Sequence, residues 1–425
     1  MIPTQRTLLC LASGHVFEDD CVHNEELGVA SLLRTVYKCT GFTPLDDMQG
    51  LYRYANWLPI DRTLEGSAAP VSYWSEKLAK RLGLNRLLIS FNGYWPERGA
   101  FMKTGSFKEC EAYSVCARFP GKGRLVVASA GNTARAFLRA ASDNNIPLVI
   151  VIPYKYINSL YAVSPVADCV HVVAIGNNAD YFDAIMVANK ICEHEGFVNE
   201  GGAKNVARRD GMGTTVLSAV EYANEIPDWY VQAIGSGTGA IAAHEANLRL
   251  NASGSFQSKK MRLLLAQNDP FTPIADAWAQ RSRTLTKQDI NEAKEQIERI
   301  DAKVLSNRNP PYSIAGGLYD ALTDSEGEVD AVTNNELRNA MALFNDLEGC
   351  DICPEAGAAL AALMKAVEAS RIDKDALVIL NITGGGESKI QRDLHPRTVK
   401  PDYLVSPYVA ENVSELDRLC EKLIC

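Results

Sequence analysis

The chain has 425 residues, which is more than one hydrophobic core usually organises, so the sequence predicts two domains. Charged residues make up 22% of it and the formal net charge is -9, so we expect no basic field and no nucleic-acid partner. No apolar run approaches the roughly 20 residues needed to cross a bilayer, so we also expect no membrane partner.

The cysteines and the first residues bear on the cellular compartment. Eleven cysteines scattered over a long chain indicate reduced thiols rather than the dense disulfides of a small secreted domain. The stretch 6–14 superficially resembles a signal peptide, but its apolar part is only about six residues long and residues 15–20 turn acidic directly after it. We therefore expect a cytoplasmic protein.

From residue 124 onward, short β-branched runs alternate with helix-like segments. In chain order, this rhythm predicts strands at 124–128, 148–152 and 170–174, with helices at 133–144 and 159–163 between them. A second series predicts helices at 214–223 and 240–250 and strands at 229–234, 261–267 and 376–382. The polar stretch 284–302 has charges at helical spacing and is interpreted as a solvated helix. The alternation predicts an α/β protein with mostly parallel sheets.

Two glycine-marked segments each allow a structural and a functional interpretation. Thr-Gly-Ser-Phe-Lys at 104–108 places Lys108 just after a glycine turn, where small residues let a ligand approach, although this segment taken alone favours a simply exposed lysine. Ser-Ala-Gly-Asn-Thr-Ala at 129–134 follows a predicted strand and opens a helix. Asn132 or Thr133 can serve as the helix N-cap, and the same backbone and hydroxyl groups can form a cradle for a carboxylate.

Two further glycine-rich segments follow predicted strands. Gly-Ser-Gly-Thr-Gly at 235–239 ends one strand and begins a helix, which favours a phosphate. It lacks the G-x-G-x-x-G spacing of a dinucleotide site and the lysine of a nucleotide P-loop, so the phosphate is not that of a nucleotide. Thr-Gly-Gly-Gly-Glu-Ser at 383–388 is a loop of the same kind. Several such loops at strand ends predict one shared crevice.

Taken in order, these segments resemble the fold type II pyridoxal-phosphate enzymes, and within them the threonine-synthase-like members. The similarity extends over most of residues 60–390. It implies the tryptophan synthase β-like fold, with two α/β domains and the cofactor, pyridoxal 5'-phosphate, in the crevice between them. It also implies a large domain of residues 46–114 and 205–425, a small inserted domain of residues 115–204, and an N-terminal segment, 1–45, that resembles a decayed zinc ribbon.

The resemblance also assigns roles to residues. Lys108 corresponds to the lysine that holds the cofactor as a Schiff base and moves the Cα proton. Asn132 corresponds to the partner of the ring hydroxyl, and Thr383 to the residue facing the pyridine nitrogen, where a neutral hydroxyl favours elimination over transamination. The cofactor phosphate would be bound by Gly235, Ser236, Gly237, Thr238 and Gly239. The substrate would be bound by Thr104, Ser129, Gly131 and Thr133.

Departures from the threonine-synthase pattern bear on metal binding. The paired cysteines of the ribbon are missing, and Cys10, His15, Cys21 and His23 have no C-x-x-C knuckle, so we expect no metal. Cys350 and Cys353 do have C-x-x-C spacing, but we interpret them as packing residues.

The altered lysine motif, the decayed N-terminus and the Asn-Pro-Pro-Tyr-Ser segment at 309–313 most resemble the cysteate synthases. That resemblance implies elimination of phosphate from O-phospho-L-serine, addition of sulfite to the resulting aminoacrylate, and release of L-cysteate for coenzyme M biosynthesis, in a homo-oligomer. Two alternatives remain open, threonine synthase acting on O-phosphohomoserine and a non-catalytic pyridoxal-phosphate-binding regulator. The anions are expected at a basic cluster that is equally well interpreted as solvated surface: Lys204, Asn205, Arg208 and Arg209.

Overall fold

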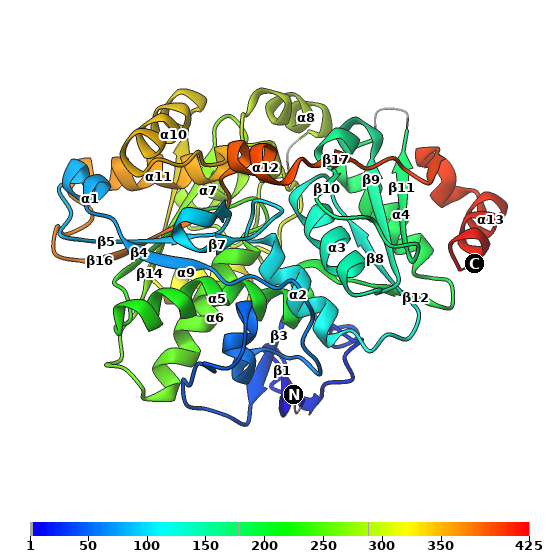
Figure 1. Cartoon of the computed structure of the whole chain (residues 1–425), viewed down its shortest axis with the longest axis horizontal. Coiled ribbons are helices and arrows are strands. Elements are labelled where there is room, and N and C mark those ends of the chain that lie inside the picture. Colours follow the sequence, from blue (N-terminus) through cyan, green and yellow to red (C-terminus); the bar gives the residue numbers. More distant parts are fainter. Residues whose placement is uncertain (1–2, 177–178, 288, 425) are drawn as a thin grey trace.

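The computed structural model describes residues 3–176, 179–287 and 289–424 and contains two sheets with helices on both faces of each (Figure 1). The larger sheet has six strands in the order β15-β14-β13-β16-β5-β4, parallel throughout except for the edge pair β4 and β5. Its strands are β4 Val71–Trp74, β5 Arg86–Phe91, β13 Trp229–Ala233, β14 Arg262–Asn268, β15 Glu328–Val332 and β16 Leu377–Ile382.

Each face of the larger sheet is covered by its own apolar cluster. One face packs against α1 Lys77–Leu82, α10 Asn334–Glu348 and α11 Pro354–Glu368. The other packs against α5 Val206–Ala223, α6 Thr238–Ser253, α7 Pro273–Ala279 and α9 Leu318–Asp324. The remaining helices of this part are α8 Ile290–Arg299 and α12 Glu387–Leu394. Burial on both faces is what a parallel sheet requires.

The smaller sheet has five parallel strands in the order β12-β8-β9-β11-β18. They are β8 Arg124–Ala128, β9 Leu148–Pro153, β11 Val170–Ile175, β12 Phe197–Asn199 and β18 Tyr403–Val405. Every residue of β9 is buried, which explains why its sequence is a continuous apolar run. The covering helices are α2 Lys108–Arg118 and α3 Asn132–Asp143 on one face, and α4 Tyr181–Ile191 and α13 Val413–Ile424 on the other.

The N-terminal lobe is a three-stranded antiparallel sheet in the order β2-β1-β3, followed by a 3₁₀ helix. Its elements are β1 Arg6–Cys10, β2 Val16–Glu18, β3 Leu33–Tyr37 and η1 Gly50–Trp57. Cys10 packs in the apolar core of this lobe, whereas Cys21 contacts Arg6 and Asp61. Across the described parts of the chain, no group of three or more histidine, cysteine or acidic side chains is arranged to hold a metal ion.

Short elements connect these parts. Two two-stranded ribbons are formed by β6 Tyr94–Trp95 with β7 Ala100–Phe101, and by β10 Tyr161–Ala162 with β17 Arg397–Thr398. The other 3₁₀ helices are η2 Pro96–Arg98, η3 Tyr154–Ser159, η4 Gly202–Lys204, η5 Lys303–Leu305 and η6 Pro407–Glu411. Among the residues that the structure describes, no helix combines the length and apolar character that a membrane crossing needs.

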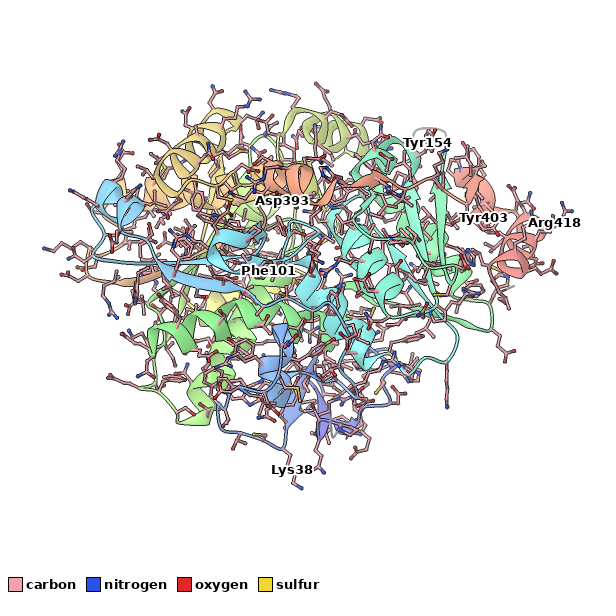
Figure 2. All side chains as sticks on the ribbon, in the orientation of Figure 1. Lys38, Phe101, Tyr154, Asp393, Tyr403 and Arg418 are labelled. Atoms are coloured by element: carbon pink, nitrogen blue, oxygen red, sulfur yellow. The ribbon has the colours of Figure 1, made fainter. Side chains whose placement is uncertain are left out.

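The C-terminal residues depart from the expected domain boundaries. The sequence analysis assigned all of 205–425 to the large domain, but β18 pairs with β11 and α13 packs against the smaller sheet. Figure 2 shows Tyr403 and Arg418 at the far end of that smaller part. After α12 the chain therefore returns to the smaller sheet. This is the third time that it passes from one sheet to the other, and a composition pattern does not reveal it.

Most of the predicted strands and helices are confirmed, with two instructive exceptions. The predicted helix at 159–163 is wrong, because Tyr161 and Ala162 form β10 by pairing with residues 397–398. The helix predicted from 214 begins eight residues earlier, at Val206. The glycines at 211 and 213 hid this first half; a side chain at Gly211 would collide with the Cys110 carbonyl of α2, so glycine here permits close packing of α2 on α5.

Candidate active site

Lys108 is the first residue of α2, at the end of a loop that is hydrogen-bonded to a second loop far away in the sequence. Ser106 forms an isolated bridge with Gly384, and the Phe107 N–H donates to the Thr383 carbonyl at 2.9 Å. Gly105 has a φ of +72°, a left-handed conformation that favours glycine, and this lets the loop turn before the helix. The structure therefore brings Lys108 and Thr383 into one site across 275 positions of sequence.

The Lys108 amine is bonded to a buried carboxylate that the sequence analysis did not single out. Lys108 Nζ lies 3.0 Å from Glu111 Oε2, one helical turn further along α2, and the Glu111 side chain has no exposed surface. Thr133 Oγ1 donates to the other oxygen, Glu111 Oε1, at 2.8 Å. Lys108 and the loop at 129–134 thus meet on one carboxylate. Glu111 could have been found from its i+3 spacing to the lysine.

Glu111 remains ionised because cations surround it. Burial alone would raise the pKa of the Glu111 carboxyl, but Arg208 and Lys108 hold that pKa below its usual value. Arg208 Nη1 lies 3.3 Å from Glu111 Oε1, and Arg208 Nε donates to Glu200 Oε1 at 2.8 Å. Burial raises the pKa of the Glu200 carboxyl, although Arg208 opposes this shift.

The loop at 129–134 begins α3 with a cap that differs from the one expected. Neither Asn132 nor Thr133 caps the helix; the Ser129 hydroxyl instead accepts from the N–H groups of Gly131 at 3.2 Å and Ala134 at 3.0 Å. The side chains of Asn132 and Thr133 are therefore free of the helix cap and bond to Glu355 and Glu111 instead. This arrangement suits a carboxylate-binding loop.

The orientation of the Asn132 amide follows from its two partners. Its Nδ2 donates to Glu355 Oε1 at 2.9 Å, and its Oδ1 accepts from the Arg135 guanidinium. An ionised Glu can only accept and an Arg can only donate, so the amide has one orientation and keeps one N–H for a further acceptor. The sequence analysis missed Glu355 and Arg135, which come from α11 and α3.

The loop at 235–239 connects β13 to α6 and packs closely against neighbouring residues. Gly237 has a φ of +77°, and an added side chain there would meet Leu318. The Ser236 and Thr238 hydroxyls lie 2.7 Å apart and the Thr238 N–H points to Ser236 Oγ at 3.3 Å. Two hydroxyls at the start of a 16-residue helix form a suitable phosphate cradle.

The predicted anion cluster is divided by the structure into four different environments. Lys204 is exposed and pairs with Glu25, and Asn205 caps α5 by accepting from the Ala207 N–H at 2.9 Å. Arg209 is fully buried, with Nε 2.9 Å from Glu245 Oε2 and its other nitrogens on backbone carbonyls. Arg208 is the member of the cluster that contacts the carboxylate bonded to Lys108.

Several buried hydroxyls in the segments next to Lys108 have no protein partner. Within the described residues, Thr104 Oγ1, Ser106 Oγ and Thr383 Oγ1 are buried and make no hydrogen bond. An unpaired buried polar group is costly, so each of these hydroxyls calls for a partner, which a bound ligand or water can supply. A lysine amine, an amide N–H, unpaired hydroxyls at residues 104, 106 and 383 and a phosphate cradle together fit pyridoxal phosphate. Cys353 packs beside Gly384, and burial raises its pKa well above the usual value, consistent with a packing role.

The family match covers most of the chain. Residues 75–384 match the family described as pyridoxal-phosphate dependent enzyme. The chain is 44% identical to the cysteate synthase of Methanosarcina mazei, covering 94% of this chain and 96% of that protein. It is 45% identical to the cysteate synthase of Methanoregula boonei, with 96% of each chain covered. The chain belongs to the cysteate synthase family of pyridoxal-phosphate dependent enzymes.

Solved structures support the fold. Maize serine racemase superposes with a TM-score of 0.58 at 18% identity, covering 77% of this chain and 91% of that one. The serine racemase of Dictyostelium discoideum gives a TM-score of 0.51 at 17% identity, covering 75% and 92%. At this identity the likeness concerns the fold alone, and it confirms the predicted fold type II architecture. The predicted cofactor, pyridoxal phosphate, is confirmed by the family.

Proposed function

We propose that this protein makes L-cysteate from O-phospho-L-serine and sulfite, with Lys108 as the lysine that binds pyridoxal phosphate. The observation that carries the proposal is the meeting of Lys108 and Thr133 on Glu111, at 3.0 Å and 2.8 Å. It puts a basic amine beside a loop suited to a carboxylate, which is the pairing that Cα chemistry on an amino acid needs. Membership of the cysteate synthase family supports the choice of product.

Each residue has a definite task in this proposal. Ser129, Gly131 and Thr133 bind the substrate carboxylate, the loop at 235–239 binds the cofactor phosphate, and Asn132 directs its remaining N–H to the ring hydroxyl. Thr383 provides a neutral hydroxyl at the ring nitrogen. When bound, the cofactor supplies the electron sink that accepts the electron pair left at Cα.

Lys108 moves the proton. Its Nζ takes the Cα proton, the Cβ–O bond breaks and phosphate leaves, sulfite sulfur then bonds to Cβ, and Lys108 returns the proton to Cα. Of the four residues expected to bind the anions, Arg208 lies beside Glu111, but Glu111 and Glu200 occupy its guanidinium, so we assign it a charge-balancing role instead of anion binding. Arg209 has its donors occupied within the protein, so we leave it out of the proposed site.

The proposal is tested by phosphate release from two substrates, with and without sulfite. O-phospho-L-serine and sulfite should give sustained release. O-phosphohomoserine, one methylene longer, carries its leaving group on Cγ, so a site shaped for the shorter substrate should turn it over at least about 100-fold more slowly. Efficient release from phosphohomoserine without sulfite would indicate a threonine synthase instead, and the proposal would be wrong.

Replacement of Asn132 tests how the cofactor is oriented. We expect Asn132→Ala to retain covalent capture of pyridoxal phosphate at Lys108, because the lysine keeps its own contacts. The kcat for phosphate release should fall roughly 10- to 100-fold, the rate equivalent of one hydrogen bond to a charged group. Steady-state kinetics and cofactor content are the measurements, and unchanged kcat would remove Asn132 from the site.

A further inference from the structure

Glu111 is the centre of a four-member charge network formed with Lys108, Arg208 and Glu200. Its carboxylate receives the Lys108 amine at 3.0 Å, the Thr133 hydroxyl at 2.8 Å and Arg208 Nη1 at 3.3 Å. Arg208 continues to Glu200, and the Glu200 side chain is only 5% exposed. Elements α2, α3 and α5 and the segment after β12 therefore converge on one buried cluster.

The buried Glu111 carboxylate is shared by two cations, Lys108 and Arg208. The second carboxylate, Glu200, pairs with Arg208 on its other side. Tyr181 of α4 also faces the cluster, and burial raises the pKa of its hydroxyl, so it stays neutral. An uncompensated charge in such a buried place is costly. Loss of the Lys108 proton would remove one of the two cations that offset the Glu111 charge.

We propose that Glu111 is a positioning residue that holds Lys108 in place and stabilises its protonated form, with Arg208 limiting how strongly it does so. This inference rests on the assignment of Lys108 as the cofactor lysine. Each time Lys108 takes the Cα proton it becomes an ammonium, and Glu111 is placed to accept a charge-assisted hydrogen bond from it. Arg208 shares the same carboxylate and so weakens its attraction for the ammonium. Lys108 can therefore still return the proton to Cα.

Two substitutions should shift the protonation of Lys108 in opposite directions. Glu111→Gln keeps the shape and the acceptor oxygen but removes one negative charge, which disfavours the ammonium of Lys108. Arg208→Gln removes the positive charge that shares the Glu111 carboxylate with the lysine, which favours the ammonium. A merely structural role for Glu111 would not make the two variants move a titration in opposite senses.

The matched control is Glu245→Gln. Glu245 is another buried acidic residue, and it pairs with Arg209, the neighbour of Arg208 on α5, at 2.9 Å. It is not among the partners of Lys108. The control therefore reproduces the loss of a buried Glu–Arg pair without touching the lysine.

The measurement is the rate at which cofactor-free protein captures pyridoxal phosphate covalently, followed by absorbance over a series of pH values, with the adduct mapped to its lysine. Capture needs the neutral amine. We expect the midpoint of the rate profile to shift down by about one pH unit or more in Glu111→Gln, since a charge within about 4–6 Å has an effect of this size. The midpoint should shift up in Arg208→Gln and should equal the wild-type value in Glu245→Gln.

The outcomes separate this inference from the proposed function. A midpoint for Glu111→Gln equal to that of the wild type, or both variants moving the same way, would overturn the role of Glu111. Should Glu111→Gln not fold, the comparison of Arg208→Gln with the wild type still decides the direction. The capture assay contains no substrate. Failure to form cysteate in a separate activity assay would therefore count against the proposed function, and the capture result would still stand.

Discussion

Replacing Lys108 with alanine should reduce phosphate release from O-phospho-L-serine by at least about 1,000-fold. The substitution removes both the group that binds the cofactor and the base at Cα, and general acid–base catalysis alone contributes roughly 10²- to 10⁴-fold. The variant should fold, because the lysine side chain is partly exposed at the start of α2 and the rest of the loop keeps its backbone bonds to residues 383–385. The measurements are kcat/KM and cofactor content.

The neighbouring lysine provides the control for that result. Lys103 is exposed and lies on the same loop, so Lys103→Ala should retain activity close to that of the wild type. Turnover by Lys108→Ala within tenfold of the wild type, or loss of cofactor only in Lys103→Ala, would contradict the assignment of Lys108.

Replacing Arg209 with methionine should lower stability rather than substrate binding. The Arg209 guanidinium is fully buried, is bonded to Glu245 and donates to the carbonyls of Leu33, Ala203 and Lys204. Removing one partner of a buried ion pair leaves the other charge unpaired and typically costs about 3–5 kcal/mol. Urea denaturation should show a much lower midpoint, while the KM for phosphoserine of the folded protein stays close to that of the wild type.

Lys204 is the matching surface position. It is exposed and its ion pair with Glu25 is solvated, so Lys204→Met should change the free energy of unfolding by less than about 1 kcal/mol. If Arg209→Met instead raised KM strongly and left the denaturation midpoint unchanged, Arg209 would bind an anion, as the sequence first suggested.

The parts of the proposed site that the sequence predicted are contiguous in the chain. Lys108, the loop at 129–134 and the loop at 235–239 each combine a glycine turn with a strand or helix boundary, which short-range patterns can reveal. The alternation of strands and helices likewise predicted the α/β architecture that the fold and the family match confirm.

What the sequence did not predict depends on partners that are distant in the chain. Glu355 contacts Asn132 across 223 positions, Arg208 reaches Glu111 from α5, and Glu200 in turn bonds to Arg208. Arg208 and Arg209 are adjacent in sequence but lie on different sides of α5, one toward Lys108 and the other toward Glu245. A pattern of basic residues cannot separate them, because the separation arises from packing. The pairing of residues 161–162 with 397–398 was hidden for the same reason.

The account is tested most directly by identifying the product formed from O-phospho-L-serine and labelled sulfite. It predicts that mass spectrometry finds L-cysteate carrying the sulfite sulfur, in an amount equal to the phosphate released, and that Lys108→Ala forms neither product. Phosphate release without incorporation of sulfite, or formation of threonine from O-phosphohomoserine at a comparable rate, would contradict it.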